Sequence, residues 1–281
     1  TVREICHARL GLSPRRAEFI PLRNERIEIR STGSLREPVF GVLMGYLCFL
    51  TAVMVFAADP MEPSISAVSE GVGLSPLLQH PAMLIHPPVV FLGYALWTVP
   101  FALAAVALVS GQLDTNWIRQ ARSWTLLAWM VSGVGILLGA DWAYEELGWG
   151  GYWGWDPVEN GSLVPWLATV ALLHGLLVQR ATGGLGRANP VLAVTGYVLV
   201  VYASFLTRSG VLADFSVHSF ADEGLTGFLL AFLAVVALAG YGTLLARPGG
   251  PPRSAPRAGG APRGTVILLG LLVLVALCAL V

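Results

Sequence analysis

The sequence predicts an all-α protein that crosses a membrane several times as a polytopic transmembrane helical bundle. Of its 281 residues, 55% are hydrophobic and only 12% are charged, whereas soluble domains usually carry about 25% charged residues. Seven apolar segments stand out, each close to the ~20 residues that an α-helix needs to cross a bilayer. Because backbone polar groups in lipid must be satisfied within the chain, we expect helices and not open strands. The alternative is a soluble protein with buried helices, but the remaining polar sequence is too short to cover seven of them.

The seven expected helices set the organisation of the chain. They span residues 39–58, 88–110, 123–141, 162–179, 190–207, 226–246 and 264–281. The first six form a core over residues 39–246, and the arginine-rich segment 1–38 before it has no evident role. Residues 247–263 are rich in proline, glycine and arginine, which is typical of a flexible linker. We expect the seventh helix to be truncated, because the sequence ends inside its apolar run.

Arginines are distributed unevenly between the two sides of this predicted bundle. All 17 basic residues are arginine, and 16 of them lie in residues 1–38 or in the loops after the second, fourth and sixth helices. The other loops, 59–87, 142–161 and 208–225, hold only Arg208. Basic loops remain on the cytoplasmic side, so we expect the arginine-poor loops to face the periplasm or exterior of a bacterial inner membrane. The 17 acidic residues balance the basic ones, so the net charge gives no indication of nucleic-acid binding.

The second arginine-poor loop, residues 142–161, is dominated by tryptophan and glycine. Four of the nine tryptophans, Trp142, Trp149, Trp153 and Trp155, fall within it, with glycines between them. Tryptophan is common at membrane interfaces, but that explains one or two residues at a helix end and not a whole loop. Glycine lets a backbone approach a ligand closely, and the aromatic rings can present flat faces to it. This pattern favours a large, planar, apolar ligand such as a porphyrin.

The end of this loop carries a helix-start signal. Asp156 followed by Pro157 and, at the third helical position, Glu159 matches the N-cap, N1 and N3 preferences of a capping box. We therefore expect Asp156 to start a short helix along the outer interface. Direct contact between Asp156 and a ligand is the alternative.

Four stretches together resemble a known family. WGGYWGWDPVE at 149–159 looks like the tryptophan-rich WWD signature of the membrane proteins that handle haem in cytochrome c biogenesis. Three further stretches occur in the family's order, LIHPP at 84–88, TRSGVL at 207–212 and SVHSFA at 216–221. The likeness runs from about residue 40 to 247 and is closer to the CcmF type, the haem lyase component, than to the smaller CcmC type.

The resemblance implies a haem b site at the outer face. His86 and His218 would be the axial ligands, which neutral imidazole suits well, above a platform of Trp149, Trp153 and Trp155. Ordinary surface histidines are the alternative. Arg208 is either a membrane anchor or, since arginine grips carboxylates with two hydrogen bonds, a partner of a haem propionate. His80 matches no ligand position of the family and is an alternative ligand.

His174 differs from the other histidines because it lies inside the fourth expected span. Counting ~1.5 Å per residue from the start of that span places it near the middle of the bilayer, where an ionisable residue is a functional candidate. The resemblance makes it a ligand of a second, buried haem whose other ligand would come from another helix. A histidine hydrogen-bonded to a neighbouring helix is the alternative.

The function implied by the resemblance is participation in the covalent attachment of haem to apocytochrome c. The chain would position haem and ligate its iron, with no nucleophile of its own. Its partners would be apocytochrome c, a membrane-anchored haem chaperone, other subunits of cytochrome c maturation, and membrane lipid. A CcmC-type delivery protein without ligation activity is the alternative, although it would not need a buried ligand such as His174. A quinol-linked cytochrome b subunit would need histidine pairs on facing helices.

Overall fold

The computed structural model describes residues 35–56, 70–71, 73–74, 76–113, 115–220, 224–246 and 270. Within these ranges every regular element is helical, and six helices are long and apolar enough to cross a membrane. They are α3 (Arg36–Phe56), α4 (Ala82–Ser110), α5 (Thr115–Glu146), α6 (Pro157–Thr182), α7 (Ala188–Arg208) and α8 (Thr226–Ala246), with a short 3₁₀ helix η1 (Pro76–Leu78) before α4. The prediction of an all-α polytopic membrane protein is therefore confirmed.

The predicted seventh helix at 264–281 lies outside the described residues, apart from Gly270. The predicted linker at 247–263 and residues 1–34 of the arginine-rich segment also lie outside them. Six of the seven predicted spans can therefore be compared with the structure, and each has its helix.

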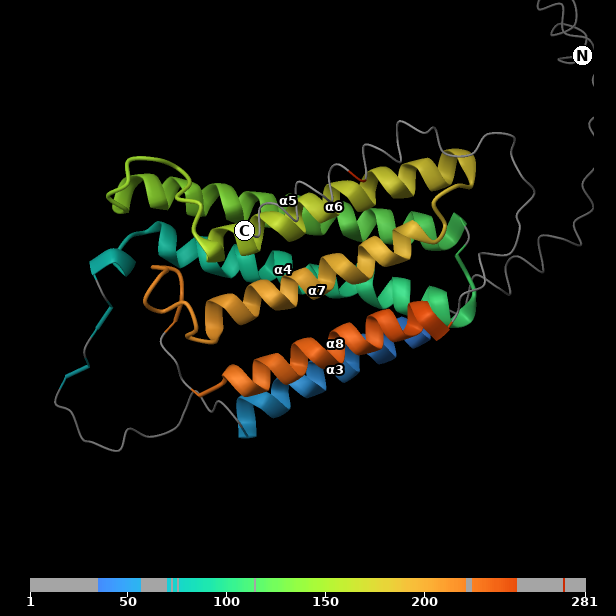
Figure 1. The fold of residues 1–281 in the computed structure, drawn as a ribbon, viewed down its shortest axis with the longest axis horizontal. Coiled ribbons are helices and arrows are strands. Elements are labelled where there is room, and N and C mark those ends of the chain that lie inside the picture. The colour runs from blue at the N-terminus through green and yellow to red at the C-terminus, as the bar shows by residue number, and fades with distance from the viewer. Residues whose placement is uncertain are drawn as a thin grey trace, which may run out of the picture. The chain divides into compact units, whose positions relative to one another are not determined.

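The helices α4 to α7 form the centre of the described bundle. Helix α4 packs on α5 and α7, and α6 packs on the same two helices, while α3 contacts α4 and α8 contacts α7 and α4. Short connections join α4 to α5 and α6 to α7 at one end, and longer loops join α5 to α6 and α7 to α8 at the other (Figure 1). Arg119, Arg122, Arg180 and Arg187 belong to the first end, so we call the other the arginine-poor end.

Small residues allow α4 and α5 to approach each other closely. A Cβ on Gly93 would come 2.9 Å from Cα of Ser132, and one on Gly135 would come 3.0 Å from Cα of Val90. Close backbone packing is the main source of helix association in lipid, because the lipid tails are as apolar as the side chains. These glycines therefore fix the distance between α4 and α5, and the functional site lies at one end of this pair.

The core at the centre of the bundle is built around large aromatic side chains. Trp97 and Trp117 are fully buried, and the Trp97 ring occupies the space that a Cβ on Gly196 would need. Phe101 and Tyr197 pack on each other with ring centroids 4.7 Å apart. This part of the bundle positions the helices without contributing to the site.

Helices α3 and α8 lie side by side at the edge of the described bundle (Figure 1). The Phe49 ring on α3 stacks on Phe228 and Phe232 of α8, with centroids 5.7 and 4.9 Å away. Most of their remaining surface is exposed within the chain. Apolar side chains on that surface are what a lipid-facing helix requires.

The start of α6 corrects one detail of the prediction. The prediction of a separate short interfacial helix is wrong. The residues after Asp156 form the first turn of α6, which continues without a break to Thr182. The capping box does start a helix, but nothing after it stops that helix before the apolar span begins. Helix α4 likewise begins at Ala82 and not at 88, so His86, Pro87 and Pro88 lie inside its first turns.

Candidate functional site

A cavity of about 360 Å³ opens at the arginine-poor end of the bundle. This volume falls in the lower part of the range typical of small-molecule sites. Its walls come from α4, α5, Trp153 of the α5–α6 loop, the start of α6, Thr207 of α7, residues 217–220 and Leu78 of η1. The lining is largely apolar and aromatic, and it includes both histidines that the sequence predicts as a pair, His86 and His218.

His86 is fixed by the neighbouring helix α5. Its Nδ1 lies 2.8 Å from the carbonyl oxygen of Gly135. The ring also packs against Gly139, one turn further on, so closely that a Cβ there would overlap it. A carbonyl oxygen only accepts hydrogen bonds, so Nδ1 carries the proton and Nε2 keeps a lone pair. This is the tautomer that a neutral imidazole needs to ligate a metal through Nε2.

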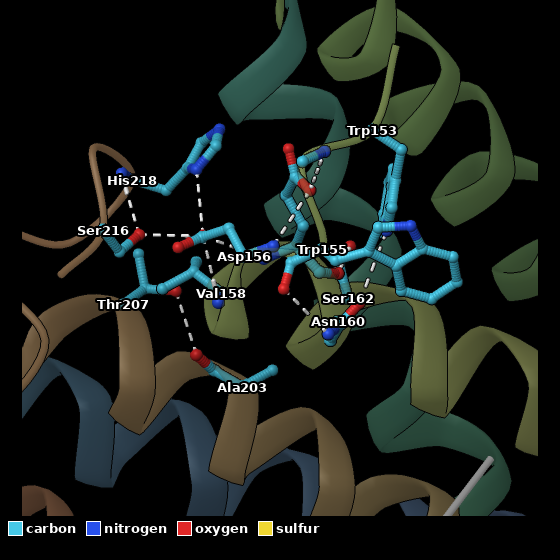
Figure 2. A network of polar contacts seen from close by, with 12 residues as sticks. Trp153, Trp155, Asp156, Val158, Asn160, Ser162, Ala203, Thr207, Ser216 and His218 are labelled. Atoms are coloured by element: carbon cyan, nitrogen blue, oxygen red, sulfur yellow. Dashed lines mark hydrogen bonds and ion pairs between the residues drawn. The ribbon is translucent and has the colours of Figure 1, made fainter. Parts of the chain in front are cut away.

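His218 is fixed by the tryptophan-rich loop. Its Nδ1 lies 3.1 Å from Oδ2 of Asp156, 62 residues earlier in the chain. Its ring meets that of Trp142 edge to face, with centroids 5.6 Å apart. Figure 2 shows the imidazole standing over the Asp156 carboxylate. When Asp156 is ionised it only accepts, so His218 also carries its proton on Nδ1 and keeps a lone pair on Nε2.

Asp156 is the N-cap of α6, as the sequence predicts. Its Oδ2 accepts hydrogen bonds from the backbone N–H groups of Val158 (3.1 Å) and Glu159 (3.3 Å), and Glu159 closes the capping box by accepting from the N–H of Asp156. Burial opposes ionisation, but the hydrogen bonds from His218 and Ser216 outweigh it and hold the pKa of Asp156 below its usual range. Asp156 therefore acts as a carboxylate that joins the helix start to His218.

The three tryptophans predicted as a platform do not occupy equivalent places. Trp153 lines the cavity, and its Nε1 lies 3.4 Å from Oδ1 of Asn160. Trp149 and Trp155 lie outside the lining, with 43% and 67% of their surface exposed. Trp155 has a φ of 56°, and its carbonyl accepts a hydrogen bond from Asn160 (Figure 2). The second tryptophan of the cavity is Trp142, which belongs to the tryptophan cluster of the sequence but not to the predicted platform.

Arg208 and His174 lie outside the cavity lining. The Arg208 guanidinium sits 4.1 Å above the Phe220 ring and 5.9 Å from Phe91, and both rings line the cavity. Arg208 is thus held beside the cavity by cation–π contacts. His174 is exposed on α6, where its Nδ1 lies 2.8 Å from the carbonyl oxygen of Val170.

Two contacts that the sequence did not reveal fasten η1 and the start of α4 to the end of α5. His80 Nε2 lies 2.9 Å from a carboxylate oxygen of Glu145, and its Nδ1 accepts the Ala82 N–H at 3.2 Å. Trp142 Nε1 donates to the Leu77 carbonyl at 3.3 Å. Both nitrogens of His80 are therefore engaged, which agrees with its lack of a ligand position in the resemblance.

Comparisons with known proteins identify the family of this chain. The family model described as cytochrome C assembly protein matches residues 19–212. The chain is 45% identical over 203 residues to the cytochrome c-type biogenesis protein CcmF of Pseudomonas fluorescens and 43% identical over 197 residues to that of Escherichia coli K12. These matches cover 70% and 69% of this chain but 30% of each relative. The chain therefore spans about a third of the length of the curated relatives it matches.

A solved structure is also similar. The cytochrome c haem lyase CcmF aligns with a TM-score of 0.66 and 27% identity, over 99% of this chain and 38% of that chain. Fold, family model and relatives agree. The chain belongs to the cytochrome c assembly protein family and, within it, to the CcmF type.

Proposed function

We propose that the cavity at the arginine-poor end binds haem b, with Nε2 of His86 and Nε2 of His218 as the axial ligands. The observation that carries this proposal is that both imidazoles line one cavity and both use Nδ1 for a hydrogen bond within the protein. Ligating histidines characteristically donate their other ring N–H to a carbonyl or a carboxylate, and this pair has one of each. The residues present thus fit a bis-histidine haem site.

The surroundings of the pair suit a porphyrin. Trp142, Trp153 and Phe91 give the cavity an aromatic lining, and aromatic faces favour flat apolar ligands. Arg208 lies beside the cavity with its guanidinium held over Phe220, where it can pair with a propionate. Asp156 contributes through His218. Trp149 and Trp155, which are exposed, are proposed to contact the part of the haem that faces away from the protein.

The proposed role of the site is to take part in attaching haem covalently to apocytochrome c. Bound haem supplies the vinyl groups to which the cysteine thiols of the apocytochrome add. The chain's own residues would hold the group in place, ligate its iron through the two imidazoles and keep water from its apolar face. The proposed partners are apocytochrome c, a membrane-anchored haem chaperone and other subunits of cytochrome c maturation. The positive-inside rule supports a cavity facing the periplasm, across a bacterial inner membrane.

A second, buried haem site at His174 is also proposed. His174 is exposed on a helix whose other faces are covered by α5 and α7. An ionisable side chain on a surface that would otherwise meet lipid calls for a partner. The second ligand would come from outside the described residues. This site distinguishes a haem lyase component from a delivery protein of the CcmC type.

Haem-loaded protein purified from membranes tests the outer site. The wild type, His86→Ala and His218→Ala are compared by haem content and by reduced and oxidised absorption spectra. We expect each single variant to lose the low-spin spectrum of two imidazole ligands and most of its haem. His174→Ala should keep the spectrum and the haem of the cavity and lose only the second haem proposed above, since His174 does not line the cavity. Unchanged haem content in both cavity variants would refute the ligand assignment.

A further inference from the structure

The Asp156 carboxylate makes more contacts than a helix cap requires. Its Oδ2 accepts the N–H groups of Val158 and Glu159, which complete the cap, and also the Ser216 hydroxyl at 2.8 Å and the His218 Nδ1–H at 3.1 Å. The last two donors come from a loop 60 and 62 residues further along the chain. One oxygen atom thus joins the start of α6 to the loop that carries His218 (Figure 2).

The loop around His218 is anchored on both sides of the histidine. The backbone N–H of His218 donates to the Ser216 hydroxyl at 3.1 Å, and the N–H of Phe220 donates to the Thr207 carbonyl at 2.9 Å. Trp142 limits the ring from another side. With the backbone fixed, the Asp156 carboxylate determines how the imidazole is oriented and which nitrogen bears the proton.

The two histidines of the cavity differ in the group that accepts their Nδ1–H. His86 donates to a neutral backbone carbonyl, that of Gly135, whereas His218 donates to a carboxylate. The side chains of Asp156 and His218 are only 9% and 17% exposed, so water screens this contact weakly. A carboxylate partner raises the basicity of a ligating imidazole. His218 should therefore be the stronger electron donor of the pair.

We propose that Asp156 is a positioning residue that holds His218 in the tautomer with a free Nε2 and makes it a stronger axial donor than His86. This inference rests on the proposed haem site. A stronger donor favours ferric over ferrous iron, so the carboxylate lowers the reduction potential of the bound haem. The aspartate of the tryptophan-rich signature thereby has a role distinct from that of the aromatic rings.

The reduction potential of the bound haem tests the electronic half of the proposal. Asp156→Asn removes the charge but leaves an oxygen acceptor and a good N-cap residue, so the variant should fold. We expect it to retain the two-imidazole spectrum and to show a raised potential. If ferric haem binds about tenfold more weakly while ferrous binding is unchanged, the rise is about 59 mV. Asp214→Asn, an exposed position in the same loop, is the matched charge control and should leave the potential unchanged. Equal potentials in the two variants would overturn the inference.

Histidine-¹⁵N NMR of the haem-free protein tests the positioning half. We expect His218 to carry its proton on Nδ1 in the wild type and in Asp156→Asn, and to become a mixture of tautomers in Asp156→Ala. An unchanged single tautomer in Asp156→Ala would show that the carboxylate does not position the ring. If Asp156→Ala does not fold, the potential of Asp156→Asn still decides. This measurement needs no haem, so it is independent of the proposed function, which fails instead if the His86→Ala and His218→Ala variants retain haem.

Discussion

The imidazole of His86 rests directly on the backbone of Gly139. A Cβ at position 139 would overlap the ring and come 2.9 Å from its Nδ1, closer than Cβ atoms approach other atoms in proteins. The ring cannot turn away without giving up its hydrogen bond to Gly135. The site therefore requires a residue without a side chain at position 139 of α5 as well as the histidine.

Replacing Gly139 by alanine should displace His86. Alanine favours the helix by about 1 kcal/mol over glycine, so we expect α5 to remain intact while the imidazole loses its position. Haem titrations into the purified variant should give an affinity lower by about tenfold or more, the usual cost of disturbing the support of a ligand. Gly45→Ala on α3, where an added Cβ meets nothing within 4 Å, is the control. Wild-type affinity in Gly139→Ala would contradict this account.

Exchanging Arg208 for lysine should weaken haem binding moderately. Lysine keeps the charge but loses the flat guanidinium that stacks on Phe220 and that forms two parallel hydrogen bonds with a carboxylate. The loss of one such bond is worth about 1 kcal/mol, or about a fivefold lower affinity. Arg180→Lys, at the opposite end of the bundle, should bind haem like the wild type. If Arg208→Lys also binds haem with the affinity of the wild type, Arg208 serves only as a membrane anchor.

The stability of the protein should depend on pH through Asp156. Because its pKa is lowered in the folded protein, the carboxylate contributes its full stabilisation above the ordinary aspartate pKa of about 3.9. That contribution is lost as the pH falls through the lower folded pKa. Thermal unfolding in detergent between pH 6 and pH 3 should therefore show a steeper loss for the wild type than for Asp156→Asn. Parallel curves for the two proteins would mean that the carboxylate is not stabilised on folding.

A polar chain at the arginine-rich end should contribute to stability and not to haem binding. Buried Asn189 donates to Gln179 Oε1 at 2.6 Å, and Gln179 donates to the Leu113 carbonyl at 3.3 Å, which links α7, α6 and the α4–α5 connection. Hydrogen bonds between membrane helices average about 0.6 kcal/mol and reach about 1.7. A double-mutant cycle of Asn189→Ala and Gln179→Ala, followed by unfolding in mixed detergent, should give a coupling energy in that range. Strict additivity, or a loss of haem from either variant, would argue against this assignment.

Much of the fold follows from the sequence because each span is long and apolar. Six of the predicted spans have their helices, but α4 and α5 extend beyond the apolar segments at their ends. Residues such as Glu145 and Glu146 are too polar for a hydropathy argument, yet they continue α5 beyond its apolar segment. The helix start at Asp156 can also be predicted from the sequence, because the capping box depends on residues only three apart.

The site was less predictable because its contacts are distant in the sequence. The contact between Asp156 and His218 spans 62 residues, and that between His86 and Gly135 spans 49. No local pattern encodes either. The resemblance predicts the pairing of His86 with His218, but it does not single out Trp142, although that residue begins the tryptophan cluster. Only the contacts of Trp142 with Leu77 and with the His218 ring show that it faces the cavity.

Trp155 combines a left-handed backbone with a ring that is 67% exposed. An L-residue pays roughly 1–2 kcal/mol for that backbone conformation, and glycine pays almost nothing. Folding alone would therefore select glycine or asparagine at this position. A library of all twenty amino acids at position 155 would be sorted once for folded protein and once for haem binding. Glycine and asparagine should rank first in the sort for folding, and aromatic residues should rank first in the sort for haem binding. The difference between the two rankings would measure how much folding stability the natural residue at position 155 gives up for binding.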